Sequence, residues 1–225
     1  ITVQEELNTC LSLQLSQKID VIGAGRTDTG VHAIQMFGHF DSTSQIDCDE
    51  LIFKLNSFLS NDILIHSVFP VSEDMHARFS ATERTYKYVV SNKRDLFNRN
   101  IYVLNKSIDI DRMNESCKLI LGERDFSSFS KSRTDTHTNI CNVSFAEWTV
   151  EKDYYIFIVR SNRFLRNMVR SLVGTILDIG VGKKDINSIS SILEKRDRRA
   201  AGDSVPAKAL FLIRIEYPNL SSYGK

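Results

Sequence analysis

The sequence lacks several features that would define its environment or chemistry at once. No apolar run approaches the roughly 20 residues that a membrane-spanning helix needs, and no low-complexity tract or obvious interdomain linker interrupts the chain. The four cysteines show no CxxC spacing and do not group with the five histidines as metal ligands do. We therefore expect a cytoplasmic protein with reduced, buried cysteines, no bound metal and no membrane partner.

The chain also lacks a strong net charge. Its 29 Lys and Arg residues balance 28 Asp and Glu residues, which leaves a net charge of +1 over 225 residues. No overall field therefore indicates a nucleic-acid partner, and any RNA surface must come from basic side chains gathered on one face. The hydrophobic fraction of 42% and the charged fraction of 25% are typical of a globular protein with one large domain or two small ones.

What the sequence does contain is an alternation of helix and strand patterns. Apolar residues at helical spacing predict helices at 1–16, 48–60, 110–121, 165–179 and 186–195. Alternating or short apolar runs predict strands at 19–24, 33–41, 63–70, 85–91, 101–104, 143–151, 155–161 and 210–217. We expect Gly122 to cap the third helix, Lys152-Asp153 to turn a hairpin, and 131–139 to be a polar loop.

The order of these elements indicates two related halves. Residues 101–225 read strand-helix-strand-strand-helix-strand, which is the split βαβ order of a ferredoxin-like unit. Residues 1–100 read helix-strand-strand-helix-strand, the same order without its leading strand. We therefore expect an α+β protein with an N-terminal half, 1–100, and a C-terminal half, 101–225. We also expect that a strand precedes Ile1 in the full-length protein.

The most informative segment runs from Val21 to Ala33, where three glycines surround a single acid, Asp28. Glycine permits positive φ and close approach of another group, and an acid on a loop between strands is placed like a catalytic carboxylate. Two known enzyme motifs resemble this segment but do not match it. A dinucleotide-binding loop needs a third glycine at position 28, and an aspartic protease needs a second Asp-Thr-Gly. The remaining alternative is an Asp that merely caps a tight turn.

The string Gly25-Arg26-Thr27-Asp28-Thr29-Gly30-Val31-His32-Ala33 resembles the signature of the TruA family of tRNA pseudouridine synthases. In that family the Asp is the catalytic nucleophile, so the resemblance implies this role for Asp28. It also implies that Arg26 occupies the space left by an extruded uridine, and that His32 takes part in substrate binding. The rest of the chain carries further motifs of the same family.

A second motif lies between residues 75 and 88. Met75-His76-Ala77-Arg78-Phe79-Ser80-Ala81 and then Arg84-x-Tyr86-x-Tyr88 resemble a family segment whose first tyrosine packs on the target base. Such stacking contributes on the order of 1–3 kcal/mol per base. From the residues alone, two tyrosines at i, i+2 more often form one buried strand face. The resemblance favours base stacking for Tyr86 and leaves Tyr88 in the core.

The segment from Arg163 to Arg170 resembles the family's Phe-x-x-x-Met-Val-Arg motif. On a helix, Arg163, Arg166 and Arg170 would share one basic face, for which the plain alternative is a solvated surface. The other side chains are apolar nearly all round, so the helix should be buried. A buried arginine needs an acid, and by resemblance Arg170 pairs with Asp28, keeping the carboxylate ionised and oriented. Arg163 and Arg166 are candidates for substrate binding.

The last motif, Ala209-Leu210-Phe211-Leu212, resembles the family's Gly-Leu-Tyr/Phe-Leu, whose first Leu lines the catalytic pocket. This makes Leu210 a further site candidate. Cys141 stands where many members carry an Arg, which removes one phosphate contact of the family. The basic run 195–199 and the pair Lys183-Lys184 are candidate phosphate contacts, although charge runs are usually solvated.

The resemblance implies the pseudouridine synthase fold, in which two ferredoxin-like halves share one mixed, mostly antiparallel sheet with a central cleft. It implies a homodimeric isomerase that acts on uridines 38 to 40, in the family's terms, of the tRNA anticodon arm. The reaction detaches uracil from C1′ and rejoins it through C5. No cofactor is expected, because no redox change occurs and no group is acquired.

Several alternatives stay open at this point. Asp28 has three possible roles: attack on C1′, attack on C6, or removal of the 2′ proton. A uridine stacked in a stem must first be extruded, at a cost of a few kcal/mol. The rival functions are a pseudouridine synthase acting on another RNA and a catalytically silent RNA-binding protein of the same fold.

Overall fold

The computed structural model describes residues 1–131 and 137–218. Contacts divide the chain into two compact units, which its path enters more than once. The first unit contains Ile1–Arg26, Met36–Ala81 and residues 216–218, and the second contains Thr27–Gln35 and the described residues of Thr82–Ile215. The halves 1–100 and 101–225 were defined by the order of predicted elements along the sequence, and this division of the chain stays a prediction.

The first unit contains two helices at the predicted places, α1 (Val3–Leu15) and α2 (Cys48–Phe58). A capping box begins α1: the Thr2 hydroxyl accepts the Glu5 N–H at 3.2 Å, and the Glu5 carboxylate accepts the Thr2 N–H at 2.8 Å. The carboxylate of Asp47 accepts a backbone N–H of the first turn of α2 at 3.0 Å. Local capping chemistry therefore sets both helix starts.

The strand expected at 19–24 is reduced to β1 (Ile22–Gly23), which pairs antiparallel with β3 (Gly38–His39). Just before β1, the Val21 N–H donates to Oδ1 of Asn8 at 2.8 Å. A polar side chain of α1 thus satisfies a backbone group that a neighbouring strand would otherwise bond. The expected strand was too long for this reason.

The strand expected at 63–70 is wrong, since these residues are described and form no strand. The side chain of Asn56 accounts for the difference. Its Nδ2 donates to the Ile65 carbonyl at 2.9 Å, and its Oδ1 accepts the Ile65 N–H at 2.7 Å. With both backbone groups of Ile65 satisfied, this part of the run needs no partner strand.

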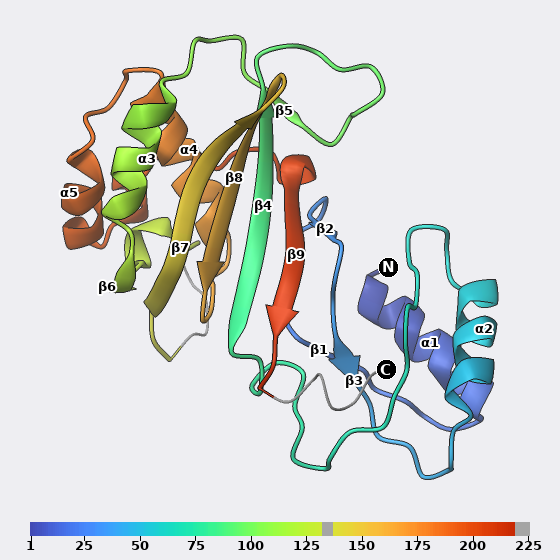
Figure 1. Ribbon diagram of the computed structural model, residues 1–225. Coiled ribbons are helices and arrows are strands. Elements are labelled where there is room, and N and C mark those ends of the chain that lie inside the picture. Colours follow the sequence, from blue (N-terminus) through green and yellow to red (C-terminus); the bar gives the residue numbers. More distant parts are fainter. Residues whose placement is uncertain (132–136, 219–225) are drawn as a thin grey trace. The chain divides into compact units, whose positions relative to one another are not determined.

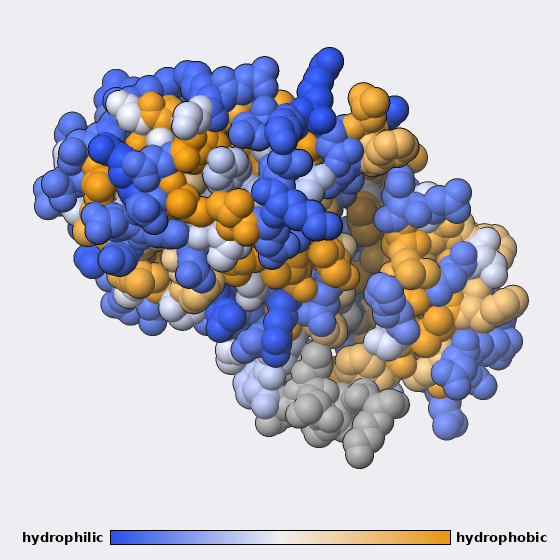
Figure 2. Space-filling model, turned by 45° about the horizontal axis from the view of Figure 1, so that its top comes forward, coloured by the Kyte–Doolittle hydropathy of each residue, from blue (hydrophilic) through white to orange (hydrophobic). Residues whose placement is uncertain are grey.

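The core of the first unit is small. Its buried members are Cys10, Leu11, Ile19, Val21, Leu51 and Leu55. Several large apolar side chains of this unit stay exposed, including Leu13, Phe53, Phe58 and Leu64. Figure 2 shows apolar, orange side chains reaching the surface among hydrophilic, blue ones.

The second unit is built on a mixed, mostly antiparallel sheet with seven strands among the described residues (Figure 1). The order is β2-β9-β4-β8-β7-β6, with β5 beside one end of β4. β2 with β9 and β4 with β5 are parallel pairs, whereas β4–β8, β8–β7 and β7–β6 are antiparallel. The strands are β2 (His32–Ala33), β4 (Glu83–Ser91), β5 (Tyr102–Val103), β6 (Gly122–Asp125), β7 (Ile140–Glu151), β8 (Tyr154–Ser161) and β9 (Leu210–Glu216).

Three α-helices of the second unit gather on one side of this sheet (Figure 1). They are α3 (Ile110–Lys118), α4 (Met168–Gly180) and α5 (Ser188–Lys195), and the short helices η1 (Ser127–Phe129), η2 (Arg198–Ala200) and η3 (Ala207–Ala209) accompany them. In the sheet, Trp148 stacks on Phe157 with ring centroids 5.0 Å apart. Nearly every side chain of α4 is buried, which confirms the prediction from its apolar composition.

The start of α4 differs from the prediction and changes the geometry of the basic segment. Asn167 has φ 67, in the left-handed region that Asn adopts more readily than most residues. This conformation interrupts the helical spacing, so Arg163 and Arg166 lie on the segment that precedes α4. The predicted single basic helix face is therefore wrong, and only Arg170 of the three arginines lies on the helix.

Two turn predictions have opposite outcomes. Gly122 does not cap α3, which ends at Lys118; Gly122 instead begins β6, a strand that the sequence pattern did not indicate. The hairpin turn is confirmed, with Lys152 at φ 57 between β7 and β8. Part of the polar loop predicted at 131–139 lies outside the described residues.

Gly174 in the middle of α4 lies directly against another backbone segment. A Cβ added at Gly174 would lie 1.8 Å from the carbonyl oxygen of Asp203. A Cβ added at Gly202 would lie 2.9 Å from the backbone nitrogen of Thr175. The Gly202 N–H also donates to Oγ1 of Thr175 at 2.8 Å. These two glycines allow residues 202–206 to lie on the surface of α4.

We expect Gly174→Ala to lower the free energy of unfolding by about 3 kcal/mol, because the new methyl group would overlap a backbone carbonyl. Gly25→Ala is the matched control. A Cβ added at Gly25 would have no atom within 4 Å, and Gly25 is not among the glycines with positive φ, so the effect of the substitution should stay within about 0.5 kcal/mol. Urea unfolding of both variants measures the difference. Equal stabilities would contradict the close packing at Gly174.

Candidate active site

Asp28 opens a tight turn in the second unit. The Val31 N–H donates to the Asp28 carbonyl at 3.0 Å, and Gly30 has φ 85. Glycine adopts such a left-handed conformation without strain. Among the hydrogen bonds of the described residues, the Asp28 carboxylate accepts none from the backbone of this turn. The side chain is therefore available for contacts outside its own loop, in contrast to a simple turn cap.

Two arginines contact the Asp28 carboxylate. Nη1 of Arg170 donates to Oδ2 at 3.0 Å, and Nε of Arg166 lies 3.8 Å from Oδ1. The side chains of Asp28 and Arg170 are 27% and 21% exposed, whereas that of Arg166 is 58% exposed. The first contact is a partly desolvated, charge-assisted hydrogen bond, and the second is a longer and more solvated ion pair. The predicted pairing of Arg170 with Asp28 is thus present in the structure.

The guanidinium of Arg170 is itself held from a second side. Its Nε donates to the Val205 carbonyl at 2.8 Å. The planar guanidinium can therefore turn little without losing one of its two acceptors. This backbone contact fixes the direction in which Nη1 points, and with it the orientation of the Asp28 carboxylate.

Tyr86 lies on β4 in the same unit and is half-buried. Its ring packs edge-on against Phe164, with centroids 5.1 Å apart and an interplanar angle of 88°. Burial raises the pKa of the Tyr86 phenol to about 12; the charge of Arg84 opposes this rise and that of Asp28 adds to it. Tyr86 therefore stays neutral near neutral pH and lies close enough to Asp28 to sense its charge.

The predicted site residues His32 and Leu210 belong to the paired strands β2 and β9. The His32 ring stacks on Phe211, with centroids 5.0 Å apart and an interplanar angle of 22°. Its Nε2 is buried, and no hydrogen-bond partner for it exists among the described residues. Leu210 is buried in the core of the second unit. Their roles toward a substrate stay predictions.

The other two predicted residues are Arg163 and Arg26. Arg163 is half-buried and lies near Cys141. Burial raises the pKa of the Cys141 thiol to about 11, and the charge of Arg163 opposes the rise. Cys141 is fully buried, so it is a core residue. Arg26 belongs to the first unit, and its role in the space left by an extruded base stays a prediction.

Much of the basic run at 195–199 is engaged within the chain. Arg196 pairs with Asp125 at 3.1 Å and Arg199 with Asp197 at 2.7 Å. Arg198 donates to the Gly202 carbonyl at 3.0 Å. Lys183 likewise contacts Asp178 at 3.2 Å. A phosphate would have to displace these partners, which weakens the case for the run as a phosphate site.

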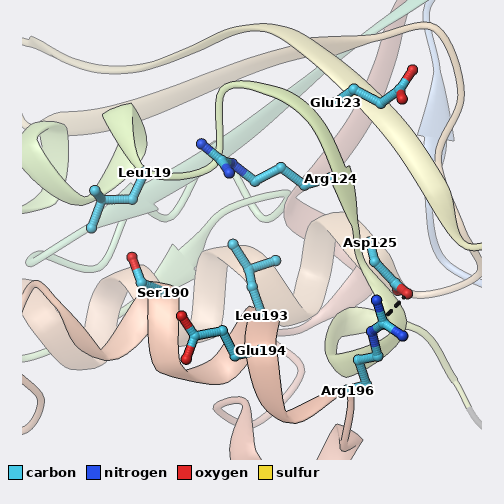
Figure 3. A pocket seen from close by; sticks show the side chains of 8 residues that line it. All are labelled: Leu119, Glu123, Arg124, Asp125, Ser190, Leu193, Glu194 and Arg196. Carbon is cyan, nitrogen blue, oxygen red and sulfur yellow. Dashed lines mark ion pairs between the residues drawn. The ribbon is translucent and has the colours of Figure 1, made fainter.

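A pocket of about 490 Å³ lies beside β6 and α5. Figure 3 shows its lining residues and the ion pair between Arg196 and Asp125. The lining contains the acids Glu123, Asp125 and Glu194 against the bases Arg124 and Arg196. This acid excess does not favour a polyanion, and none of the predicted site residues lines the pocket.

The described residues give no indication of a metal site or a membrane span. Within 1–131 and 137–218, no three His, Cys, Asp or Glu side chains cluster so that they could hold a metal ion. In the same ranges, no helix combines the length and the apolar character that crossing a membrane requires. Cys10, Cys48, Cys117 and Cys141 are all free thiols.

The sequence did not indicate which residues hold the guanidinium of Arg170 through the Val205 carbonyl. They lie in 202–206, an irregular segment with no helical or strand pattern. One signal was present: Gly174 lies inside a strongly helical pattern, and an isolated glycine there usually has a packing reason. The structure shows that reason in the contact with Asp203.

Comparison with known proteins identifies the family. The family model described as tRNA pseudouridine synthase matches residues 117–218. The chain is 45% identical over 222 residues to "tRNA pseudouridine synthase A" of Parabacteroides distasonis, with 97% of this chain and 87% of that protein covered. It is 47% identical to the protein of the same name from Bacteroides thetaiotaomicron, with 96% and 82% covered.

A more distant relative, "tRNA pseudouridine synthase A" of Francisella tularensis subsp. novicida, is 37% identical over 223 residues, with 98% of this chain and 86% of that protein covered. Such identities over nearly the whole chain agree with the mixed α+β architecture and with the motifs around Asp28, Tyr86 and Arg170. The chain therefore belongs to the tRNA pseudouridine synthase family of isomerases and has the pseudouridine synthase fold.

Proposed function

We propose that this protein isomerises uridine to pseudouridine in tRNA, with Asp28 as the nucleophile. One observation carries the assignment of the residue: a partly desolvated carboxylate is held by Arg170 at 3.0 Å and approached by Arg166 at 3.8 Å. The two neighbouring guanidinium groups pair with the carboxylate and fix the direction of an acid suited to nucleophilic attack. The names of the relatives, tRNA pseudouridine synthase A, support tRNA as the substrate.

The two oxygens of Asp28 have different surroundings, which favours one of them as the reacting atom. Oδ2 accepts a hydrogen bond from Arg170 at 3.0 Å, while Oδ1 faces the longer 3.8 Å contact with the exposed Arg166. A lone pair of Oδ1 is therefore less engaged. We assign attack to Oδ1 and orientation to the contact of Oδ2 with Arg170.

The chemistry balances without a cofactor. In the route through C1′, Oδ1 bonds to C1′ as the N1–C1′ bond breaks, and uracil leaves with the bonding electron pair. The detached base turns, C5 bonds to C1′, and the carboxylate leaves. The proton lost from C5 is replaced by one gained at N1. Attack on C6 or removal of the 2′ proton would equally require an ionised Asp28.

Tyr86 and Arg166 have supporting roles in this proposal. Tyr86 presents a neutral ring near Asp28, and base–aromatic stacking is worth about 1–3 kcal/mol. Arg166 is 58% exposed, so it can exchange its long contact with Asp28 for a phosphate of the RNA at little cost. Arrival of the RNA would then release Oδ1 for the reaction.

We further propose uridines 38 to 40 of the anticodon arm, in the family's terms, as the targets. A homodimer that grips one tRNA across both subunits would explain how a chain with a net charge of only +1 binds a polyanion. A tRNA substrate would place the protein in the cytoplasm. A silent RNA-binding protein is the weaker alternative, because such a protein has no need of a half-buried acid.

The assay for this function uses purified protein, unmodified tRNA transcripts, and carbodiimide labelling followed by reverse transcription to map pseudouridine. We expect Asp28→Asn to slow product formation by more than about a thousandfold, because an amide cannot act as the nucleophile. The variant should remain folded, since the amide is nearly isosteric. Asp153→Asn, at the exposed hairpin turn, is the control and should retain wild-type activity. Activity of Asp28→Asn within tenfold of wild type would remove Asp28 from the nucleophile role.

Arg170→Lys should lower turnover about a hundredfold, because a lysine keeps the charge but lacks the rigid planar fork that directs Nε to Val205 and Nη1 to Asp28. Arg170→Ala should in addition lose about 1–3 kcal/mol of stability, since the half-buried carboxylate is left without its nearest partner. Single-turnover kinetics and thermal unfolding measure the two effects. Arg166→Lys is the matched control, with a loss of less than tenfold in rate. If Arg170→Lys and Arg166→Lys behaved alike, the distinction between the two contacts would be wrong.

Tyr86→Phe should retain tRNA affinity, whereas Tyr86→Ala should weaken it by roughly tenfold or more, because stacking requires the ring and not the hydroxyl. Both substitutions are made in the Asp28→Asn background, so that binding is measured without turnover. A filter-binding titration gives the dissociation constants. Equal weakening by Phe and Ala would show that stacking is not what Tyr86 contributes.

A further inference from the structure

Three consecutive hydrogen bonds connect the interior of the sheet to the Asp28 carboxylate. The hydroxyl of Tyr88, on β4, donates to the Pro206 carbonyl at 2.9 Å. The adjacent carbonyl, that of Val205, accepts Nε of Arg170 at 2.8 Å, and Nη1 of Arg170 reaches Asp28 at 3.0 Å. The peptide units of Val205 and Pro206 therefore lie between Tyr88 and the guanidinium.

The segment 202–206 has no regular secondary structure, and one backbone hydrogen bond, from the Val205 N–H to the Arg170 carbonyl at 3.3 Å, joins it to α4. Side chains make its other hydrogen bonds among the described residues. At its start, the Gly202 N–H donates to Thr175 at 2.8 Å. In its middle, the Ser204 hydroxyl accepts from Asn167 at 2.6 Å and from Arg198 at 2.9 Å. At its end, the Pro206 carbonyl accepts from Tyr88. The contact with Tyr88 is therefore the anchor that lies next to Val205 on the side toward β9.

The hydroxyl of Tyr88 has no evident packing function. Tyr88 is fully buried, and a phenylalanine would fill almost the same volume in this core. A buried phenol needs a hydrogen-bond partner, and here that partner is the Pro206 carbonyl. Burial raises the pKa of Tyr88 well above its usual range, while the charge of Arg170 opposes the rise. The group therefore remains a donor at any pH at which the protein functions.

We propose that Tyr88 is a positioning residue for the isomerisation, because its hydroxyl holds the 202–206 segment in the place from which the Val205 carbonyl orients Arg170 on Asp28. This inference rests on the proposed role of Asp28 and adds to it the structural support of the carboxylate's partner. The sequence alone indicated only a core residue at this position. The function of the hydroxyl appears from the chain of contacts.

The test compares Tyr88→Phe with wild type by single-turnover kinetics on an unmodified tRNA transcript. We expect the rate constant at saturating enzyme to fall about five- to tenfold, with the dissociation constant for tRNA unchanged within twofold. Tyr155→Phe is the control, because Tyr155 packs against the same core and no hydrogen bond of its hydroxyl is found in the described part of the chain. This control should leave the rate unchanged. A rate for Tyr88→Phe within twofold of wild type would overturn the proposal.

A double-mutant cycle separates positioning from general stability. In the Arg170→Lys background, Tyr88→Phe should change the rate less than twofold, because the guanidinium that it positions is already absent. A loss of the same size in both backgrounds would show that Tyr88 acts independently of Arg170. Ser204→Ala removes a hydroxyl that accepts two hydrogen bonds in the same segment, so it should also lower the rate. An unchanged rate for Ser204→Ala would contradict the proposed role of the 202–206 segment.

The outcomes also separate this inference from the proposed function. An active wild type, an inactive Asp28→Asn and a fully active Tyr88→Phe would leave the function in place and remove only the role of Tyr88. A wild-type protein without pseudouridine formation on any tRNA transcript would remove the function itself. Thermal unfolding of Tyr88→Phe is measured alongside, and a rate loss that disappears when the assay temperature is lowered well below its melting point would indicate destabilisation in place of positioning.

Discussion

The hydrogen bond between Arg170 and Asp28 joins residues that are 142 positions apart, and the geometry of the candidate site depends on it. Asp28 reaches this contact from a turn that leads directly into β2, while Arg170 comes from the first turn of a helix that is buried on nearly all sides. Each side chain alone would be a half-buried charge with a desolvation cost. Together they give an oriented anion, which is what a nucleophilic carboxylate requires.

The surroundings of this pair show how a family motif is supported by residues outside it. Two backbone carbonyls are central to this support: that of Val205 accepts a hydrogen bond from Arg170, and that of Pro206 accepts one from Tyr88. The two glycines at 174 and 202 permit the close backbone approach on which this arrangement depends. The segment pairs with no neighbouring strand: the Val205 N–H donates to the backbone carbonyl of Arg170, and its other hydrogen bonds are to side chains such as Thr175 and Tyr88. Such a segment carries no periodic signal.

In the first unit, too, side chains satisfy backbone groups that a neighbouring strand would otherwise bond. Apolar runs at 19–24 and 63–70 have the composition of strands, yet Asn8 and Asn56 satisfy backbone groups of Val21 and Ile65 directly. A backbone group needs one good partner, and a nearby amide side chain competes well with a strand. Strand propensity is therefore a weak guide where Asn residues of a neighbouring helix can reach the chain.

The sequence by itself indicated the α+β class, the presence of α1 and α2, the buried character of α4 and, through the family motifs, the candidates Asp28, Tyr86 and Arg170. These follow from local periodicity and from motif strings. Tertiary structure alone decided that α4 begins after a left-handed Asn167, that Arg196 pairs with Asp125, and that the hydroxyl of Tyr88 reaches Pro206. The physical reason is that these contacts join groups far apart in the chain, and no local pattern encodes which distant partner a polar group will meet.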